Sequence, residues 1–420
     1  IKSLPFKLTD DQKNALDEII GDLSSNHKMN RLLQGDVGSG KTIVAFLAMY
    51  YNSVCGYQSA LMAPTEILAI QHYNNMKELF KSTNIEIALL TGSVSKKEKQ
   101  DIYKKLESGE ISMIIGTHAL IQEDVKYGNL GLVITDEQHR FGVNQRANLK
   151  NKGISVDVLY MSATPIPRTY ALTIYGDMDI STIKQLPSGR KEVKTFVRTE
   201  AEMKDVLSQM NEELKKKHQI YVIAPLIEQS DNSDLSNVYN LKDKMNLAFG
   251  SKYNIDIVHG KMKPEAKDLI MSEFKQNKIN ILISTTVIEV GVDVENATMI
   301  VIFDAERFGL STLHQLRGRV GRNSFESKCI LISNMEKERL KIMETVYDGF
   351  EISEQDFKLR GAGDLFGVKQ SGDMSFKIAN LKSDYKILVQ AKKDSLEYLK
   401  NKDYDKDSIK MRLISSIENS

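Results

Sequence analysis

Gly35-Asp36-Val37-Gly38-Ser39-Gly40-Lys41-Thr42 is the stretch that decides the fold of this chain. It follows a short apolar segment ending in Leu32-Leu33, which we expect to be a buried strand. It precedes an apolar segment from Ile43 to Met49, which we expect to be a helix. A strand, a glycine-rich loop and a helix in that order are the context of the phosphate-binding motif G-x-x-x-x-G-K-[ST]. All fixed positions match, so nucleotide binding is favoured over a glycine-rich turn with a chance lysine.

Each part of this loop has a distinct role in that interpretation. The glycines let the backbone N–H groups of residues 35–40 turn inward around phosphate oxygens. The helix that follows adds its positive N-terminus to the same anion. Lys41 would reach the β- and γ-phosphates, and the Thr42 hydroxyl would hold Mg²⁺.

Length and composition bound the other possibilities. The chain has 420 residues, too many for one ordinary core, so we expect two or three domains. No apolar run is long enough to span a membrane, and Ile1 in place of Met indicates a piece of a longer protein. Cys55 and Cys329 lack metal-ligand spacing, which favours a reducing, cytoplasmic setting. Because the net charge is only +1, local basic surfaces would have to attract any nucleic acid.

Strands and helices alternate through the first half of the chain. This alternation predicts a parallel sheet with helices on both faces. Each predicted strand ends in polar or small residues, and functional groups of such sheets gather beyond the carboxyl ends of the strands. After the first loop, the predicted strands are 59–63, 85–90, 113–115, 132–135 and 158–161.

Asp136 and Glu137 directly follow one of these strands. Asp136 would bind Mg²⁺ through water, and Glu137 would orient or deprotonate the water that attacks the nucleotide. On their own, two acids could equally be a solvated cap of the next helix. The upstream phosphate loop favours the catalytic interpretation.

Gln12 has two possible roles near the start of the chain. With Thr9 it fits a capping box for a helix that runs to about Ile20. Its amide could also read the edge of an adenine, with Phe6 nearby. The residues alone leave both roles open.

The second half repeats the alternation after a linker at 185–190. It contains no second phosphate loop, which predicts a duplicated fold whose nucleotide site has been lost or changed. The predicted strands are 193–197, 220–224, 255–258, 281–284, 299–303 and 329–332.

Two polar segments of this half carry chemistry. The arginines of the segment 315–322 are interrupted by glycines, so they could converge on phosphate; a solvated basic turn would explain the charge but not the glycines. In the segment 285–293, hydroxyls suit a nucleic-acid backbone and Asp293 suits a ribose hydroxyl. Glu289 and Asp293 could instead be ordinary helix surface.

Together these residues resemble the superfamily 2 helicases, in which two RecA-like domains flank one ATP. The motifs stand in the family's order: GDVGSGKT at Gly35, APTEILAIQHY at Ala63, DEQH at Asp136, SATPIPR at Ser162, STTVIEVGVDV at Ser284 and QLRGRVGR at Gln315. The stretch 356–372 resembles the translocation motif of the RecG family and of the transcription-repair coupling factor. The stretch 376–381 and the polar helix after it look like RecG. Nothing in the chain resembles the wedge domain that precedes these motifs in RecG proteins.

The resemblance implies an α/β fold of two tandem RecA-like parallel-sheet domains, 1–187 and 188–345, with a translocation motif and helical extension at 346–420. It implies an ATP-dependent double-stranded DNA translocase and helicase that remodels branched DNA, including stalled forks and Holliday junctions, in recombination and repair. The expected cofactors are ATP and Mg²⁺. The expected partners are branched and double-stranded DNA and a single-stranded DNA-binding protein, with no membrane. We expect a monomer in the bacterial cytoplasm, associated with the nucleoid.

Three alternatives remain open at this point. An RNA helicase would bind single strands and would need no translocation motif. The coupling factor would bind RNA polymerase. A switch or scaffold that does not hydrolyse nucleotide is disfavoured by the presence of Glu137, Arg319 and Arg322.

The resemblance also implies roles for single residues. Gln12 would read adenine, and Lys41, Thr42, Asp136 and Glu137 would carry out the ATP chemistry. Arg319 and Arg322 would reach the γ-phosphate from the second domain, with Gln315, Gly291 and Asp293 at the same ATP site. The residues implied to touch DNA phosphates are Thr65, Thr91, Thr117 and Thr286. Ser162 and Thr164 would link the ATP site to the DNA.

Arg360 and Gln370 are implied to couple domain closure to movement along DNA. We expect a helical pair at 335–350 followed by a tight turn at 360–363. On composition alone, a surface loop that caps the second domain is slightly favoured.

Overall fold

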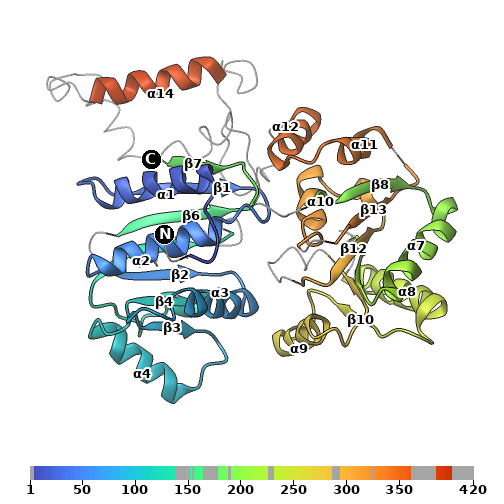
Figure 1. Ribbon diagram of the computed structural model, residues 1–420, viewed down its shortest axis with the longest axis horizontal. Coiled ribbons are helices and arrows are strands. Elements are labelled where there is room, and N and C mark those ends of the chain that lie inside the picture. The colour runs from blue at the N-terminus through green and yellow to red at the C-terminus, as the bar shows by residue number, and fades with distance from the viewer. Residues whose placement is uncertain are drawn as a thin grey trace. The chain divides into compact units, whose positions relative to one another are not determined.

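The computed structural model describes residues 4–137, 149, 152–153, 156–163, 178–187, 191–225, 231–285, 294–322, 325–335, 337–360 and 385–399. Its contacts divide the chain into two compact units. One unit comprises Ile1–Ile166 with Asp179–Leu359, and the other comprises Pro167–Met178 with Arg360–Ser420. The first unit contains two parallel sheets (Figure 1).

The first sheet has seven described strands in the order β3-β4-β2-β5-β6-β1-β7. Every pair is parallel, as the alternation of strands and helices predicts. The strands are β1 (Asn30–Gly35), β2 (Gln58–Met62), β3 (Ile87–Leu90), β4 (Met113–Gly116), β5 (Leu130–Thr135), β6 (Asp157–Ser162) and β7 (Asp179–Ile183). β7, which pairs with β1 at the edge, was not predicted.

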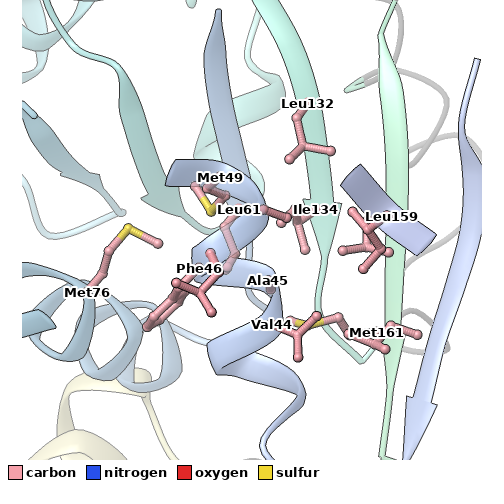
Figure 2. Close-up of a cluster of buried hydrophobic side chains, with 14 of the residues drawn as sticks. Val44, Ala45, Phe46, Met49, Leu61, Met76, Leu132, Ile134, Leu159 and Met161 are labelled. Carbon is pink, nitrogen blue, oxygen red and sulfur yellow. The ribbon is translucent and has the colours of Figure 1, made fainter. Parts of the chain in front are cut away.

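Helices cover this sheet because its strand residues alternate between two cores. Leu61 lies in the core with α1 (Asp10–Leu23), α2 (Lys41–Val54) and α3 (Glu66–Leu79). Its neighbour Met62 lies in the core on the opposite face, with α4 (Lys96–Glu107). Figure 2 shows Leu61, Ile134 and Leu159 of three neighbouring strands beside α2, whose Phe46 is on the side toward Met76 of α3.

The second sheet has six described strands in the order β10-β11-β9-β12-β13-β8, all parallel. They are β8 (Lys194–Arg198), β9 (Gln219–Ile223), β10 (Ile255–Val258), β11 (Ile281–Ser284), β12 (Ala297–Ile302) and β13 (Lys328–Ile332). One face packs against α7 (Met203–Lys215) and α8 (Asp231–Phe249). The other packs against α9 (Pro264–Lys275), α10 (Leu310–Arg317), α11 (Lys337–Thr345) and α12 (Gly349–Arg360).

The second sheet repeats the first strand for strand, apart from β7. A pair of side-chain hydrogen bonds at the start of the second strand of each sheet also recurs. Gln58 at the start of β2 donates from Nε2 to Leu106 O and Ile111 O, at 2.9 and 2.8 Å. Gln219 at the start of β9 donates in the same way to Phe274 O and Ile279 O, at 2.6 and 2.7 Å. These bonds support the predicted duplication.

The start of α7 differs from the start of α2. Between β8 and α7 the chain forms a 3₁₀ turn, η3 (Glu200–Glu202), with no glycine-rich loop. Thr199 donates to Glu202 Oε2 from both its N–H and its hydroxyl, at 2.8 Å each.

The helical pair after the second sheet extends further than predicted. α12 runs to Arg360, so the expected turn cannot begin there. Ile352 of this helix packs in the core of the second sheet. Residues 361–363 lie outside the described part of the chain. Beyond them the structure describes α14 (Tyr385–Leu399). No described helix is both long and apolar enough to cross a membrane.

Candidate nucleotide site

The glycine-rich loop joins β1 to α2, as predicted. Gly40 precedes α2 in the left-handed conformation, with φ of 83°, which favours glycine. A Cβ atom at residue 40 would also overlap Gln12 Nε2. The loop is therefore shaped for glycine both by its backbone and by its neighbour.

Lys41 folds back over the loop. Its buried Nζ atom donates to Gly35 O at 2.7 Å and to Asp36 O at 2.9 Å. These carbonyl oxygens hold the ammonium at the mouth of the loop, where a phosphate would meet it. Ser39 Oγ is buried in the same loop and bonds to no described residue, so it offers a further polar group.

Asp136 and Glu137 lie beyond the carboxyl end of β5. The Asp136 N–H donates to Met62 O at 2.9 Å, which extends the pairing with β2. Asp136 Oδ1 accepts the Glu137 N–H at 2.9 Å, and Oδ2 lies 2.9 Å from His72 Nε2. Glu137 adopts a φ of 49°, an uncommon conformation that recurs at functional sites.

Electrostatics make Glu137 unusual among the acids. Burial, reinforced by the charge of Asp136, raises the pKa of Glu137 to about 7. The charges of Lys41 and Arg319 act on this pKa in the opposite direction. The structure therefore brings Arg319, from the second sheet, into the electrostatic environment of Glu137.

The oxygen donors of the site fit a hard cation. Mg²⁺ is held in proteins by one or two carboxylates together with water and substrate phosphates. Asp136 would supply such a carboxylate, and the Thr42 hydroxyl would be a further oxygen ligand. Among the described residues, no group of three His, Cys, Asp or Glu side chains could hold a metal without such help.

Gln12 has the first of its two predicted roles, the capping of α1. It forms the capping box with Thr9: the Thr9 N–H donates to Gln12 Oε1 at 2.9 Å, and the Gln12 N–H donates to Thr9 Oγ1 at 3.2 Å. Its Nε2 donates to Ser39 O at 2.8 Å, so the amide also reaches the phosphate loop. Adenine recognition stays a prediction, and the amide retains a second N–H and a second lone pair for it.

The arginines of the segment 315–322 do not all converge, although their spacing would allow it. Arg317 is buried and its guanidinium donates to Met343 O, Val346 O and Tyr347 O, at 2.9, 3.1 and 3.2 Å. Carbonyl groups at the end of α11 thus hold it within its own domain. Arg319 and Arg322 both act electrostatically on the Tyr221 hydroxyl, so these two do share a region.

Asp36 turns its side chain toward the second sheet. Its Oδ1 lies 2.5 Å from His314 Nε2, and its Oδ2 accepts the Gly349 N–H at 3.2 Å. His314 Nδ1 in turn lies 2.8 Å from Arg317 Nη2. Burial acts to raise the pKa of Asp36, but the His314 bond and charge, the Val37 N–H and Lys41 together hold it below its ordinary value. Sequence reasoning missed His314.

The threonines expected to face DNA follow three neighbouring strands. Thr65 caps α3 by accepting the Leu68 N–H at 3.4 Å, and Thr117 precedes a 3₁₀ turn, η1 (His118–Ile121). Thr91 is buried and donates to Glu66 Oε1 at 2.7 Å, so a phosphate would compete with that carboxylate. Their contact with DNA stays a prediction.

The remaining predicted residues fall into two groups. Gln315 is buried in α10, and Ser162 is buried at the end of β6. Those outside the described residues are Thr164, Thr286, Gly291, Asp293 and Gln370, and for Arg360 only the backbone is described.

Three protein families match consecutive parts of the chain. The DEAD/DEAH box helicases match residues 9–173, and the helicase conserved C-terminal domain matches residues 202–324. Domain 3, C-terminal, of the ATP-dependent DNA helicase RecG matches residues 346–415.

Relatives in the bacteria extend this similarity along almost the whole chain. The ATP-dependent DNA helicase RecG of Staphylococcus epidermidis strain RP62A is 53% identical over 406 residues, which cover 96% of this chain and 59% of that protein. The protein of the same name from Bacillus subtilis strain 168 is 51% identical over 399 residues, which cover 94% and 58%. The chain thus spans less than two thirds of the length of these relatives.

A solved structure agrees with these relatives. The structure of RecG bound to a three-way DNA junction is 47% identical in sequence, with a TM-score of 0.79 over 92% of this chain and 51% of that chain. The chain therefore belongs to the RecG family of helicases.

Proposed function

We propose that this chain is the motor of an ATP-dependent double-stranded DNA translocase and helicase that remodels branched DNA, such as stalled replication forks and Holliday junctions, in recombination and repair. The observation that carries the proposal is one site built from both sheets. Lys41 and Glu137 stand on the first sheet, and Asp36, in the same loop as Lys41, lies 2.5 Å from His314 of the second sheet's α10. The charge of Arg319, which follows α10, acts on the pKa of Glu137. The family supports DNA as the substrate, and a relative solved with a three-way junction supports a branched form.

The first sheet would supply the groups for ATP hydrolysis. Lys41 would exchange the carbonyl oxygens of Gly35 and Asp36 for phosphate oxygens. Glu137, with a pKa near neutral, is suited to accept a proton from the attacking water. When bound at Thr42 and Asp136, Mg²⁺ would neutralise charge on the β- and γ-phosphates.

The second sheet would sense the γ-phosphate. Arg319 and Arg322 would contact it while ATP is present, and its loss on hydrolysis would let the two sheets separate. DNA would be gripped through its phosphates, for which Thr65, Thr91 and Thr117 are candidates. Recognition of this kind is independent of base sequence.

The setting of this activity is part of the proposal. A motor of this kind would work on the nucleoid in the bacterial cytoplasm, as a monomer, and would meet a single-stranded DNA-binding protein wherever strands are exposed. Arg360 and Gln370 would couple closure of the ATP site to movement.

The test is ATP hydrolysis with no nucleic acid, linear duplex DNA, a three-way DNA junction or single-stranded RNA. We expect stimulation by both DNAs, with affinity falling steeply as salt rises because phosphate contacts release counterions. Lys41→Ala should abolish hydrolysis, and Glu137→Gln should stop turnover while retaining ATP binding. Stimulation by RNA alone would overturn DNA as the substrate, and no hydrolysis under any condition would overturn the proposed activity.

A further inference from the structure

His72 of α3 is in contact with a carboxylate of the candidate nucleotide site. Its side chain is buried, only 4% of the residue being exposed, and its Nε2 atom lies 2.9 Å from Asp136 Oδ2. The predicted roles of the site leave His72 without one. The contact raises the question of what His72 does for Asp136.

His72 completes the fixation of the Asp136 carboxylate. A carboxylate is otherwise broadly free to turn about its last side-chain bond. In Asp136 the backbone is held by Met62 O and the inner oxygen by the Glu137 N–H, both at 2.9 Å. The bond with His72 therefore sets the direction of the outer oxygen.

The imidazole itself is held by packing between α2 and α3. The Phe46 ring meets it edge-on, at 86° with 6.0 Å between ring centres. Phe46 lies on α2, four residues after Thr42, on the side that faces Met76 of α3 (Figure 2). His72 is thus a rigid support, since its ring lies against the helix that carries Thr42.

The other ring nitrogen shows that the polar side of His72 is directed at Asp136. His72 Nδ1 is buried and bonds to no described residue. A buried polar atom without a partner costs free energy, so an apolar side chain would fill this space at lower cost. The bond with Asp136 is what offsets that cost.

We propose that His72 is a positioning residue, which fixes the Asp136 carboxylate in the orientation that holds Mg²⁺ beside the phosphates. The inference rests on the proposed function. Groups that orient metal ligands in this way affect metal affinity by about 10- to 100-fold when they are removed.

The test measures binding of the fluorescent nucleotide mant-ATP to the full chain, with Mg²⁺ and with EDTA. His72→Leu removes the N–H donor at similar volume, whereas His72→Gln keeps an N–H near the position of Nε2. We expect the increase in mant-ATP affinity that Mg²⁺ produces to be about 10-fold smaller in His72→Leu than in the wild type. The affinity measured in EDTA should be unchanged. His72→Gln should recover most of the increase.

Met76→Leu, one turn further along α3 in the same core, is the matched packing control. It should retain the wild-type increase. If Mg²⁺ raises the mant-ATP affinity of His72→Leu as much as that of the wild type, the inference is wrong. It is also wrong if Met76→Leu loses as much of this increase as His72→Leu and His72→Gln does not restore it. No hydrolysis enters this measurement, so a failure of the proposed activity would appear separately, as a wild-type chain without DNA-stimulated turnover.

Discussion

His314 Nε2 lies 2.5 Å from Asp36 Oδ1, so a histidine of the second sheet's α10 holds a residue of the phosphate loop on the first sheet. Gly349 and Arg317 both pack closely against this pair of side chains. A Cβ at Gly349 would lie 2.6 Å from His314 Nε2 and 2.9 Å from Asp36 Oδ2. Arg317 backs the imidazole through Nδ1, at 2.8 Å. Asp36, expected to serve ATP directly, therefore also ties the loop to the second sheet.

The Asp36–His314 contact should be visible in stability. Asp36→Ala and His314→Ala each leave a buried polar partner behind, so each should lower the unfolding temperature of the nucleotide-free chain by roughly 5 °C or more. The double variant should lose clearly less than the sum, because the two residues share one interaction. Calorimetry of the four proteins gives the comparison.

Asp10→Ala is the matched control for that experiment. Asp10 pairs with Lys13 on the surface at 3.2 Å, with both side chains at least half exposed. Its removal should change the unfolding temperature little, because exposed pairs contribute little to stability. Strictly additive shifts for Asp36 and His314 would contradict their coupling.

Substitution of Arg317 should lower stability, whereas substitution of Arg322 should lower ATP turnover. Arg317→Ala removes a guanidinium that bonds to three backbone carbonyl groups, so it should lower the unfolding temperature. Arg317→Lys should not restore it, since one ammonium cannot replace the planar fork. Arg322→Ala should instead reduce ATP turnover by about 10³-fold, with nucleotide affinity almost unchanged. Equal losses of stability and turnover in both variants would refute this division.

Glu137 should make the metal-free chain less stable as the pH rises. Its pKa is about 7 when folded, against an ordinary value of 4.5, so the folded chain binds a proton more tightly than the unfolded chain. The contribution of this proton to the free energy of unfolding is fully present below pH 4.5 and is lost as the pH rises through 7. In EDTA, Glu137→Gln should match wild type at pH 4.5 and be more stable at pH 8, by on the order of 2 kcal/mol.

The measurement is denaturant unfolding at both pH values. Glu98→Gln is a suitable control, because Glu98 is exposed on α4 and its pKa is lowered by bonds from Ser95 rather than raised. It should not gain stability at pH 8. The same absence of gain in Glu137→Gln would mean that the carboxylate ionises without cost in the folded chain.

The two cysteines should react at different rates with a thiol reagent. Cys55 is exposed, whereas Cys329 is buried in β13, and burial raises the pKa of its thiol to about 12. The native chain should therefore show one fast thiol, and the second should appear only in denaturant. Cys55→Ala should abolish the fast phase. Fast labelling of Cys329 would mean that the second sheet opens readily.

The strands were predictable because parallel strands buried on both faces are apolar runs. β7 escaped prediction because it is an edge strand whose side chains are partly exposed, and its Ser181 is instead needed by Arg31, which donates to it at 2.9 Å. The places of the glycine-rich loop after β1 and of Asp136 and Glu137 after β5 were predictable because each motif is local, whereas their roles stay predictions. The structural role of Arg317 was not predictable, because the carbonyl groups that accept its hydrogen bonds lie 26 to 30 residues away in the sequence.

The histidines were hidden for a related reason. His72 meets Asp136 across 64 residues, and His314 meets Asp36 across 278. A single histidine in an apolar helix carries no spacing signal that would point to either partner. Only the packing of α3 and α10 against the sheets brings these pairs together.

The turn after β8 explains why a chain with two similar sheets needs only one phosphate loop. In the first sheet, β1 leads into the glycine-rich loop, and Gly40 precedes α2 in the left-handed conformation. In the second sheet the Thr199 N–H and hydroxyl both donate to the Glu202 carboxylate of the same chain. A phosphate would have to displace this carboxylate from both donors, so we expect nucleotide titration to saturate at a single equivalent.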